Sequence, residues 1–254
     1  AESRAVSYRK PKDWFVSSST WTPHAVAAKA APTAVSLWRA VEAQHVVSTM
    51  RLVDSLEEQR VLEDILEETK PPVPPAAAKL DYLLFTPFRY PSPFASRFRA
   101  VGDPGVFYGA ESVRTACAEL GYWRWRFLCD SAGLTTLGPA QQTLFQAGVK
   151  TRAVDLERKP YVRDAKMWRD PDDYTSAQAF AHAAREAGIG LIQYASVRDP
   201  EPGRCGAVLR PDAFSSKRPT AATQTWQLTV TRDYAVWHRD RDAYEFDMRV
   251  WQRR

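Results

Sequence analysis

The spacing of apolar residues predicts a helical segment in the first third of the chain. Between Val41 and Glu68, apolar side chains recur at every third or fourth position, which is the period of an amphipathic helix. We therefore expect one long helix or two stacked helices there, within an inserted segment at about 41–80. The sequence KPPVPP at 70–75 ends the pattern, because proline cannot donate a hydrogen bond to a helical ladder.

The residues before this segment show no sustained period. Residues 1–36 are rich in Ala, Ser, Lys and Pro, and we interpret them as an N-terminal extension that precedes a domain over 37–254. A short apolar run at 35–38 leads into Arg39.

Later apolar runs predict short strands interspersed with two helices. A buried strand is expected at 80–85 and a long proline-containing loop at 86–105, while helices are expected at about 112–129 and near 175–187. The other runs that predict strands are GVFYGA, QTLFQAGV, TRAVDL, GIGLIQYASVR, GAVLR, TWQLTV and YAVWHR. Strands and helices are mixed without a regular β-α-β rhythm, so an α+β fold is favoured over a doubly wound sheet.

Length and composition limit the class of protein. With 254 residues, of which 44% are hydrophobic and 26% charged, the chain can form one well-packed domain. No stretch approaches the roughly 18–20 apolar residues of a membrane span, and no segment resembles a signal peptide. The three cysteines lack C-x-x-C spacing and the four histidines are scattered, which argues against a zinc site or a disulfide framework. We expect a soluble protein of the reducing cytoplasm with no bound metal.

The net charge of +5 is mild, but arginine dominates it, with 26 arginines against 9 lysines. Arginine is the side chain suited to a bidentate grip on phosphates and carboxylates. A basic nucleic-acid-binding module is one interpretation, and nine tryptophans are compatible with it. However, basic and acidic residues alternate, as in HRDRDAYEFD at 238–247, whereas a phosphate-tracking protein should carry one basic face.

Glu119 is the most informative candidate for chemistry. On a helix its neighbours at three and four positions are Thr115, Ala116, Tyr122 and Trp123, none of which is basic. Such a carboxylate either lies at the rim of the helix in water, or pairs with a remote arginine, or lines a pocket with aromatic walls. In the last case it is a candidate for a catalytic or ligand-orienting group.

Three further segments hold candidate residues. Tyr108 ends a short strand 11 residues before Glu119, so both side chains can face one cleft, although a lone tyrosine of this kind is usually a core residue. Arg97 and Arg99 flank Phe98, and in extended backbone both arginines point to one side; they form a pyrophosphate clamp or a solvated basic loop.

Ser196 and Arg198 follow a buried strand, where polar side chains either line a site or stabilise a turn. No Ser-His-Asp spacing, G-x-S-x-G motif or Gly-rich phosphate loop is found.

Taken together, these segments resemble the RES domain, the toxin component of RES–Xre toxin–antitoxin modules, which is named after an Arg, a Glu and a Ser. The resemblance extends from about residue 37 to 238. The matching segments, in chain order, are LWRAV with Arg39, Ala95-Ser96-Arg97-Phe98, GVFY with Tyr108, TACAEL with Glu119, and LIQYASVR with Ser196 and Arg198. Ala95 replaces the usual Gly, and the inserted residues 41–80 indicate a longer subfamily.

The resemblance implies a fold similar to that of ADP-ribosyltransferases, with a split β core and flanking helices around an NAD⁺ cleft. It implies a toxin that cleaves the nicotinamide–ribose bond of NAD⁺, with water or phosphate as acceptor. NAD⁺ is then a substrate, and no cofactor is required. A mono-ADP-ribosyltransferase that modifies a cellular protein is the alternative that the resemblance leaves open.

The resemblance also implies roles for individual residues. Glu119 would hold the ribose hydroxyls and stabilise the oxocarbenium-like cation. Tyr108 would frame the nicotinamide ring, and Ser196 would hydrogen-bond the nicotinamide–ribose end. The residues expected to hold the rest of NAD⁺ are Arg39 and Arg97 at the pyrophosphate, with Arg99, Arg198 and Tyr122 as further contacts.

The implied partner is a cognate antitoxin of the Xre helix-turn-helix type, through which alone the toxin would contact DNA. A homodimer is left open, and no membrane partner is expected. The inserted helical segment is interpreted either as an added layer over the sheet or, alternatively, as a docking surface for the antitoxin or a lid over the cleft.

Overall fold

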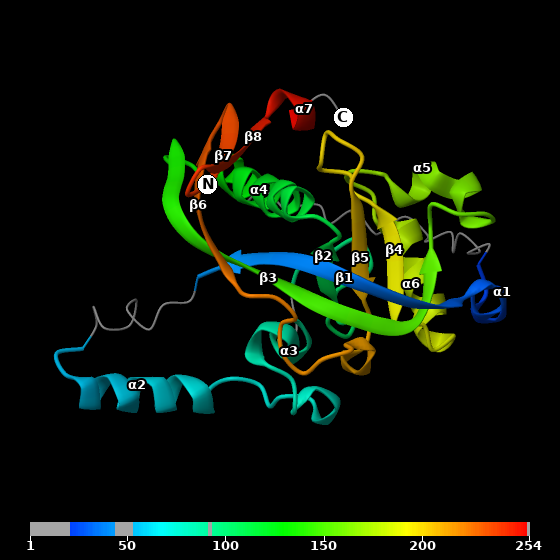
Figure 1. Ribbon diagram of the computed structural model, residues 1–254, viewed down its shortest axis with the longest axis horizontal. Helices are drawn as coiled ribbons and strands as arrows, with labels where there is room; N and C mark the ends of the chain where they lie inside the picture. The colour runs from blue at the N-terminus through cyan, green and yellow to red at the C-terminus, as the bar shows by residue number, and fades with distance from the viewer. Residues whose placement is uncertain (1–20, 44–52, 91–92, 253–254) are drawn as a thin grey trace, which may run out of the picture.

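The computed structural model describes residues 21–43, 53–90 and 93–252 (Figure 1). The helices are α1 (Pro23–Lys29), α2 (Leu56–Glu68), α3 (Tyr82–Arg89), α4 (Val113–Asp130), α5 (Ala165–Trp168), α6 (Thr175–Glu186) and α7 (Arg249–Gln252). The strands are β1 (Ala31–Glu42), β2 (Phe107–Ala110), β3 (Thr136–Asp155), β4 (Leu191–Ala195), β5 (Arg204–Val208), β6 (Gln224–Thr231), β7 (Tyr234–Arg239) and β8 (Asp242–Asp247).

The strands form one sheet in the order β1-β2-β5-β4-β3-β6-β7-β8, and β1 also pairs with β3. Among the strand pairs of the described residues, only β3 with β4 is parallel, so the expected α+β class is confirmed. β1 pairs along one side of β3. Strands β6 and β4 therefore both pair on the other side of β3, each near one end of that strand. The sheet is therefore split there, as expected.

A loop covers the open edge of β3 between its two partners. The Ser215 amide donates to the Gly148 carbonyl at 2.9 Å, and the Thr220 amide donates to the Gln146 carbonyl at 2.8 Å. These bonds satisfy carbonyl groups that no strand pairs with at this point. β3 itself is one strand of 20 residues, where two separate strands were expected at QTLFQAGV and TRAVDL.

The expected extension at 1–36 is wrong for its second half. Residues 21–36 form α1 and about half of β1, which pairs with β3 from Ala31 opposite Ala153 to Glu42 opposite Gln142 (Figure 1). The sequence APTAVS has few large apolar side chains, so its strand is held by backbone pairing and gives little periodic signal. Residues 1–20 lie outside the described residues.

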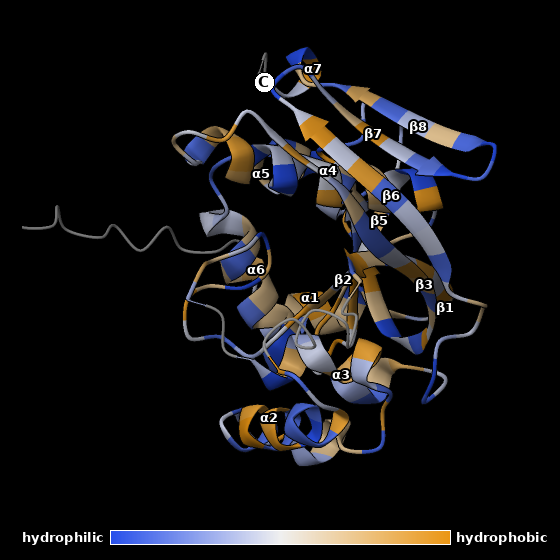
Figure 2. Cartoon of the chain, turned by 90° about the vertical axis from the view of Figure 1, so that its left-hand side faces the viewer, coloured by the Kyte–Doolittle hydropathy of each residue, from blue (hydrophilic) through white to orange (hydrophobic). Residues whose placement is uncertain are grey.

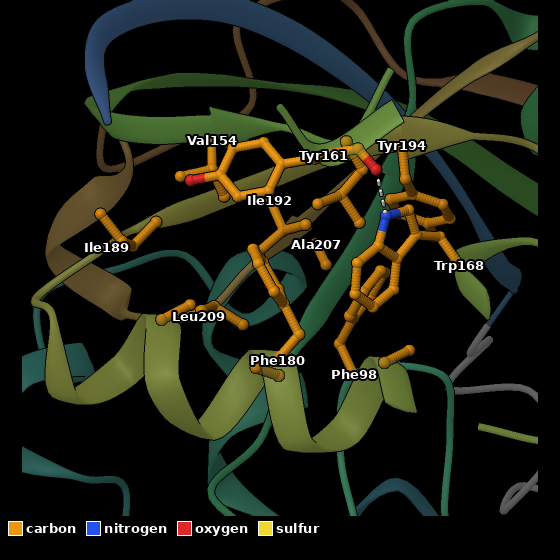
Figure 3. Packing of buried hydrophobic residues seen from close by; sticks show 14 of the residues in the cluster. Phe98, Val154, Tyr161, Trp168, Phe180, Ile189, Ile192, Tyr194, Ala207 and Leu209 are labelled. Carbon is orange, nitrogen blue, oxygen red and sulfur yellow. Dashed lines mark hydrogen bonds between the residues drawn. The ribbon is translucent and has the colours of Figure 1, made fainter. Parts of the chain in front are cut away.

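Hydrophobic side chains gather in three clusters around the sheet. One lies between α3 and the strands β1 to β5, with Leu37, Phe107, Phe145, Leu191 and Val208. A second lies under α4 against β6, β7 and β8. The third lies between α6 and β4 and β5, and includes Phe98, Tyr161, Trp168, Phe180, Ile192 and Tyr194 (Figure 3). In it, the Trp168 indole N–H donates to the Tyr161 carbonyl at 2.9 Å, so the buried indole is satisfied.

The strand expected at 80–85 is instead the start of α3. Asp81 caps this helix, since its carboxylate accepts from the Leu83 amide at 3.0 Å. Leu84 is buried and Leu80 and Phe88 pack beside it, four residues apart in each direction, which is helical spacing. The helix continues to Arg89, so the loop expected from 86 begins later.

The helix expected in the inserted segment is present as α2, but it does not form a layer over the sheet. Figures 1 and 2 both place α2 on the far side of α3 from the sheet. Val61 and Ile65, on its apolar face, are 54% and 53% exposed. A 2.7 Å ion pair between Glu67 and Arg89 ties α2 to α3. Of the rest of the expected segment, 41–42 belong to β1 and 44–52 lie outside the described residues.

Candidate active site

A cavity of about 240 Å³ opens between α4 and the strands β1, β2 and β5. One face of α4 forms a wall, because Ala116, Glu119, Leu120 and Trp123 recur at helical spacing. The remaining lining residues come from the strands and from three loops, and are Trp38, Arg39, Ala40, Ser96, Arg97, Tyr108, Gly109, Ala110, Tyr174, Tyr194, Arg198 and Cys205.

Glu119 and Ser196 are joined directly. The Ser196 hydroxyl donates to Glu119 Oε1 at 2.6 Å, and the Cys205 thiol lies 3.8 Å from the same oxygen. Within the described part of the chain, no Lys, Arg or His forms an ion pair with Glu119. The carboxylate is thus oriented by a neutral donor and remains free to face a cation in the cavity.

The turn after β4 fixes the direction of that hydrogen bond. Ser196 Oγ accepts from the amides of Arg198 at 3.2 Å and Asp199 at 2.9 Å. With both lone pairs engaged by N–H groups, the hydroxyl proton is left for Glu119.

Asp199 joins the same turn to the first turn of α4. Its buried carboxylate accepts from the Thr115 hydroxyl at 2.8 Å and forms an ion pair with Arg114. Thr115 and Glu119 are one helical turn apart on α4, so Asp199 holds the serine-bearing turn beside the glutamate-bearing helix.

Tyr108 lines the cavity and also shapes the arginine loop. Its hydroxyl forms a 2.8 Å hydrogen bond with the Ser96 hydroxyl and accepts from the Phe98 amide at 3.0 Å. Burial raises the pKa of the Tyr108 phenol, so it stays neutral near pH 7.

Arg39 projects from β1 into the lining of the cavity. It donates to the Tyr108 carbonyl at 2.8 Å, and its guanidinium carbon lies 5.0 Å from the centroid of the Phe107 ring. Among the described residues, nothing accepts from its buried Nε. Burial lowers the pKa of Arg39 from 12.5 to about 10, because the charged guanidinium loses hydration here. An anion in the cavity would offset the unfavourable free energy of this desolvation.

Arg97 and Arg198 both reach the loop between α5 and α6. Arg97 donates to the carbonyls of Trp168 and Asp170, each at 2.7 Å, and its guanidinium lies 4.8 Å from the Tyr174 ring centroid. Arg198 donates to the Tyr174 hydroxyl at 3.2 Å. Both arginines are nearly buried yet contribute to the cavity wall, so they position this loop and add positive charge to the site.

Three predicted site residues do not line the cavity. One is Ser196, whose hydroxyl contacts Glu119 and two backbone amides instead. The backbone of Ser96 and Arg99 forms a tight turn with mutual hydrogen bonds of 2.8 and 3.1 Å, so the segment is not extended and Arg99 does not join Arg97. Tyr122 lies beneath Arg198, with 3.6 Å between the guanidinium carbon and the ring centroid. It supports Arg198 instead of lining the site.

Of the predicted site residues, the cavity is lined by Glu119, Tyr108, Arg97, Arg39 and Arg198, and Ser196 is linked to this group through its hydrogen bond to Glu119. The lining residues that were not among the predicted site residues include four aromatic residues, Trp38, Trp123, Tyr174 and Tyr194. Trp123 had a visible signal, because it lies four positions after Glu119 on one helix. Tyr174 reaches the site only through tertiary contacts with Arg97 and Arg198.

One cavity of this split α+β fold is thus lined by three arginines and by a carboxylate that has no ion-pair partner among the described residues. A family model described as the RES domain matches residues 73–231, which is more than half of the chain. The protein belongs to the RES domain family. The match includes the predicted Arg97, Tyr108, Glu119 and Ser196, while Arg39 lies before it.

Among solved structures, the chain is similar to one from the M. tuberculosis MbcT–MbcA toxin–antitoxin complex. The TM-score is 0.44 at 13% sequence identity, over 91% of this chain and 94% of that chain. No match is found among proteins of curated function.

The described residues contain no helix with the length and hydropathy needed to cross a bilayer. They also contain no group of three or more His, Cys, Asp or Glu residues arranged to hold a metal ion.

Proposed function

We propose that this protein cleaves the glycosidic bond between nicotinamide and ribose in NAD⁺. The observation that carries the proposal is the Glu119 carboxylate, which faces a cavity, is oriented by Ser196 and has no ion-pair partner among the described residues. Membership of the RES family, and the resemblance to the toxins of RES–Xre modules, support the same activity.

The chemistry suits this arrangement. The bond between ribose C1′ and the pyridinium nitrogen breaks, and its electron pair leaves with nicotinamide, which becomes neutral. No strong general acid is needed for such a leaving group. The ribose becomes an oxocarbenium-like cation, which the Glu119 carboxylate stabilises electrostatically. An oxygen of water or phosphate then attacks C1′; with water, the product is ADP-ribose and a proton is released.

The positive charge of the site is suited to the rest of the substrate. Arg39, whose buried Nε lacks an acceptor among the described residues, would bind the pyrophosphate. Arg97 and Arg198 would add to the field that attracts it. Tyr108 would frame the nicotinamide, since its hydroxyl is already engaged by Ser96 and only its ring is left to contact a ligand.

As part of this proposal, the protein acts as a toxin that a cognate Xre-type antitoxin restrains, and it contacts DNA only through that antitoxin. An antitoxin segment that covers the cavity would compete with NAD⁺ for the same arginines. Co-expression with and without the antitoxin, followed by growth and cellular NAD⁺ measurement, tests this part.

Proton NMR of the purified protein with NAD⁺, with and without phosphate, tests the activity itself. We expect free nicotinamide from the wild type, and a loss of roughly 100- to 1,000-fold in its rate of release from a folded Glu119→Gln variant. A change of product from ADP-ribose to its 1″-phosphate would identify phosphate as acceptor.

Labelled NAD⁺ distinguishes NAD⁺ degradation from the alternative, the transfer of ADP-ribose to a cellular protein. Label retained on a protein would show ADP-ribosyl transfer instead of NAD⁺ degradation. Intact NAD⁺ together with no labelled protein in a lysate would contradict the proposal.

A further inference from the structure

The cavity holds only part of a dinucleotide. Its volume of about 240 Å³ is below the roughly 300–1,000 Å³ typical of pockets for drug-sized ligands, and a dinucleotide with two ribosides is larger than such a ligand. If the ribose of nicotinamide lies at Glu119, the adenosine half must extend past the cavity rim. A side chain at the rim can then contact the adenosine half.

One aromatic residue of the lining is placed for this contact. Trp123 lines the cavity and is 48% exposed, whereas Tyr194 is buried and Tyr174 is engaged by two arginines. Trp123 follows Glu119 by four residues on α4, which is about 6 Å along the helix axis on the same face. A half-exposed aromatic ring at the edge of the cavity can stack on a planar ligand.

We infer that Trp123 is the stacking platform for the adenine base, and that it makes the enzyme prefer a dinucleotide over a nicotinamide mononucleotide. The inference rests on the proposed function. It assigns the reacting end to Glu119 in the cavity, the pyrophosphate to Arg39, and the purine to the rim.

The test compares two substrates that share the reacting bond. Nicotinamide mononucleotide carries the same nicotinamide–ribose bond as NAD⁺ but has no adenosine. In Trp123→Ala, we expect KM for NAD⁺ to rise about 5- to 150-fold, the range that corresponds to loss of one base–aromatic stack, with kcat little changed. Both constants for the mononucleotide should stay at their wild-type values. Trp123→Phe, which keeps a ring, should restore most of the affinity for NAD⁺.

Phe127 supplies a matched control. It lies one helical turn beyond Trp123 on α4, is 55% exposed and does not line the cavity. Phe127→Ala removes a similar exposed ring from the same helix and should leave KM for both substrates unchanged.

Binding of ADP-ribose, measured by calorimetry, gives a readout that does not depend on turnover. This probe contains the adenine but no nicotinamide, so Trp123→Ala should weaken it by the same factor as KM for NAD⁺. If the wild type cleaves NAD⁺ and Trp123→Ala has the same KM for NAD⁺ as the wild type, the inference is overturned and the proposed function is not. An equal rise for both substrates would also overturn it, because the ring would then contact the nicotinamide end. A wild type that neither cleaves NAD⁺ nor binds ADP-ribose would overturn the inference together with the proposed function.

Discussion

Ser196 donates a hydrogen bond of 2.6 Å to Glu119, although 77 residues separate them in the chain. Two elements create this contact: α4 carries the glutamate, and the turn after β4 carries the serine. The Ser196 hydroxyl oxygen also accepts hydrogen bonds from two backbone amides, so the hydroxyl has one orientation. The site therefore presents a carboxylate whose direction is set before any ligand binds, which is what electrostatic stabilisation of a short-lived cation requires.

Replacement of Ser196 tests this orientation. In Ser196→Ala the carboxylate loses its donor, and we expect kcat for NAD⁺ cleavage to fall by roughly 10- to 150-fold, which corresponds to a hydrogen bond to a charged group. Ser196→Thr keeps a hydroxyl and should recover much of the rate. If Ser196→Ala kept full activity with an unchanged melting temperature, the serine would have no part in orienting Glu119.

We predict that Asp199 acts on the proposed reaction only through its contacts with Ser196 and Thr115, as a positioning residue. Asp199→Asn can still accept from Thr115 but loses the charge that pairs with Arg114, and we expect about 1–2 kcal/mol lower stability. The turn that carries Ser196 is then less well held. We expect kcat to fall at temperatures where the variant is fully folded, while KM changes little.

Asp212 offers a control for this variant. It forms an exposed ion pair with Arg210, and neither residue lines the cavity. Asp212→Asn should leave kcat, KM and the free energy of unfolding close to wild type. A fall in stability without any change in kcat for Asp199→Asn would assign Asp199 a purely structural role.

Much of this architecture is predictable from local sequence. α4 follows from an amphipathic run of apolar residues behind a Ser112 cap, and β6 follows from alternation at Trp226, Leu228 and Val230. Glu119 could be singled out because it has no basic neighbour on its helix. Ser196, at the end of a buried strand, was equally compatible with a turn-stabilising role, and it does accept two amides of its turn.

The errors have physical causes as well. β1 is held by pairing with β3 more than by burial of its own side chains, so its small residues give no alternation. The apolar run at 80–85 is compatible with a strand or a helix, and the Asp81 cap favours the helix. Arg99 fails to join Arg97 because a backbone turn at Ser96 replaces the extended geometry on which that expectation depended. Long-range contacts such as Asp199 with Thr115 have no local signal.

Arg39 is predicted to set the affinity for the pyrophosphate. Arg39→Gln removes a charged donor from a half-buried place, and we expect KM for NAD⁺ to rise by roughly 10- to 150-fold with a smaller effect on kcat. Arg210→Gln, an exposed change outside the cavity, is the control. An unchanged KM in Arg39→Gln would exclude this residue from the anion site.

The pH dependence of binding gives a second test of Arg39. Burial lowers its pKa to about 10, so the empty site loses this positive charge as the pH rises through 10. The anion binds the protonated form, hence the wild-type affinity for ADP-ribose should fall across that range. Arg39→Gln has no proton to lose at this position, so its affinity for ADP-ribose should not show the decline caused by this group. Circular dichroism at each pH checks that both proteins are folded.

Thiol reactivity tests the burial of the cavity wall without reference to activity. Cys117 and Cys205 are buried, and desolvation raises the pKa of both thiols, whereas Cys129 is partly exposed. Because the thiolate is the reactive form, we expect dithiobisnitrobenzoate at pH 8 to modify one thiol quickly in the native protein and all three after denaturation. Cys129→Ser should abolish the fast phase and leave NAD⁺ cleavage intact. A fast phase that persists in Cys129→Ser and that ADP-ribose suppresses would mean that Cys205, beside Glu119, is open to solvent through the cavity.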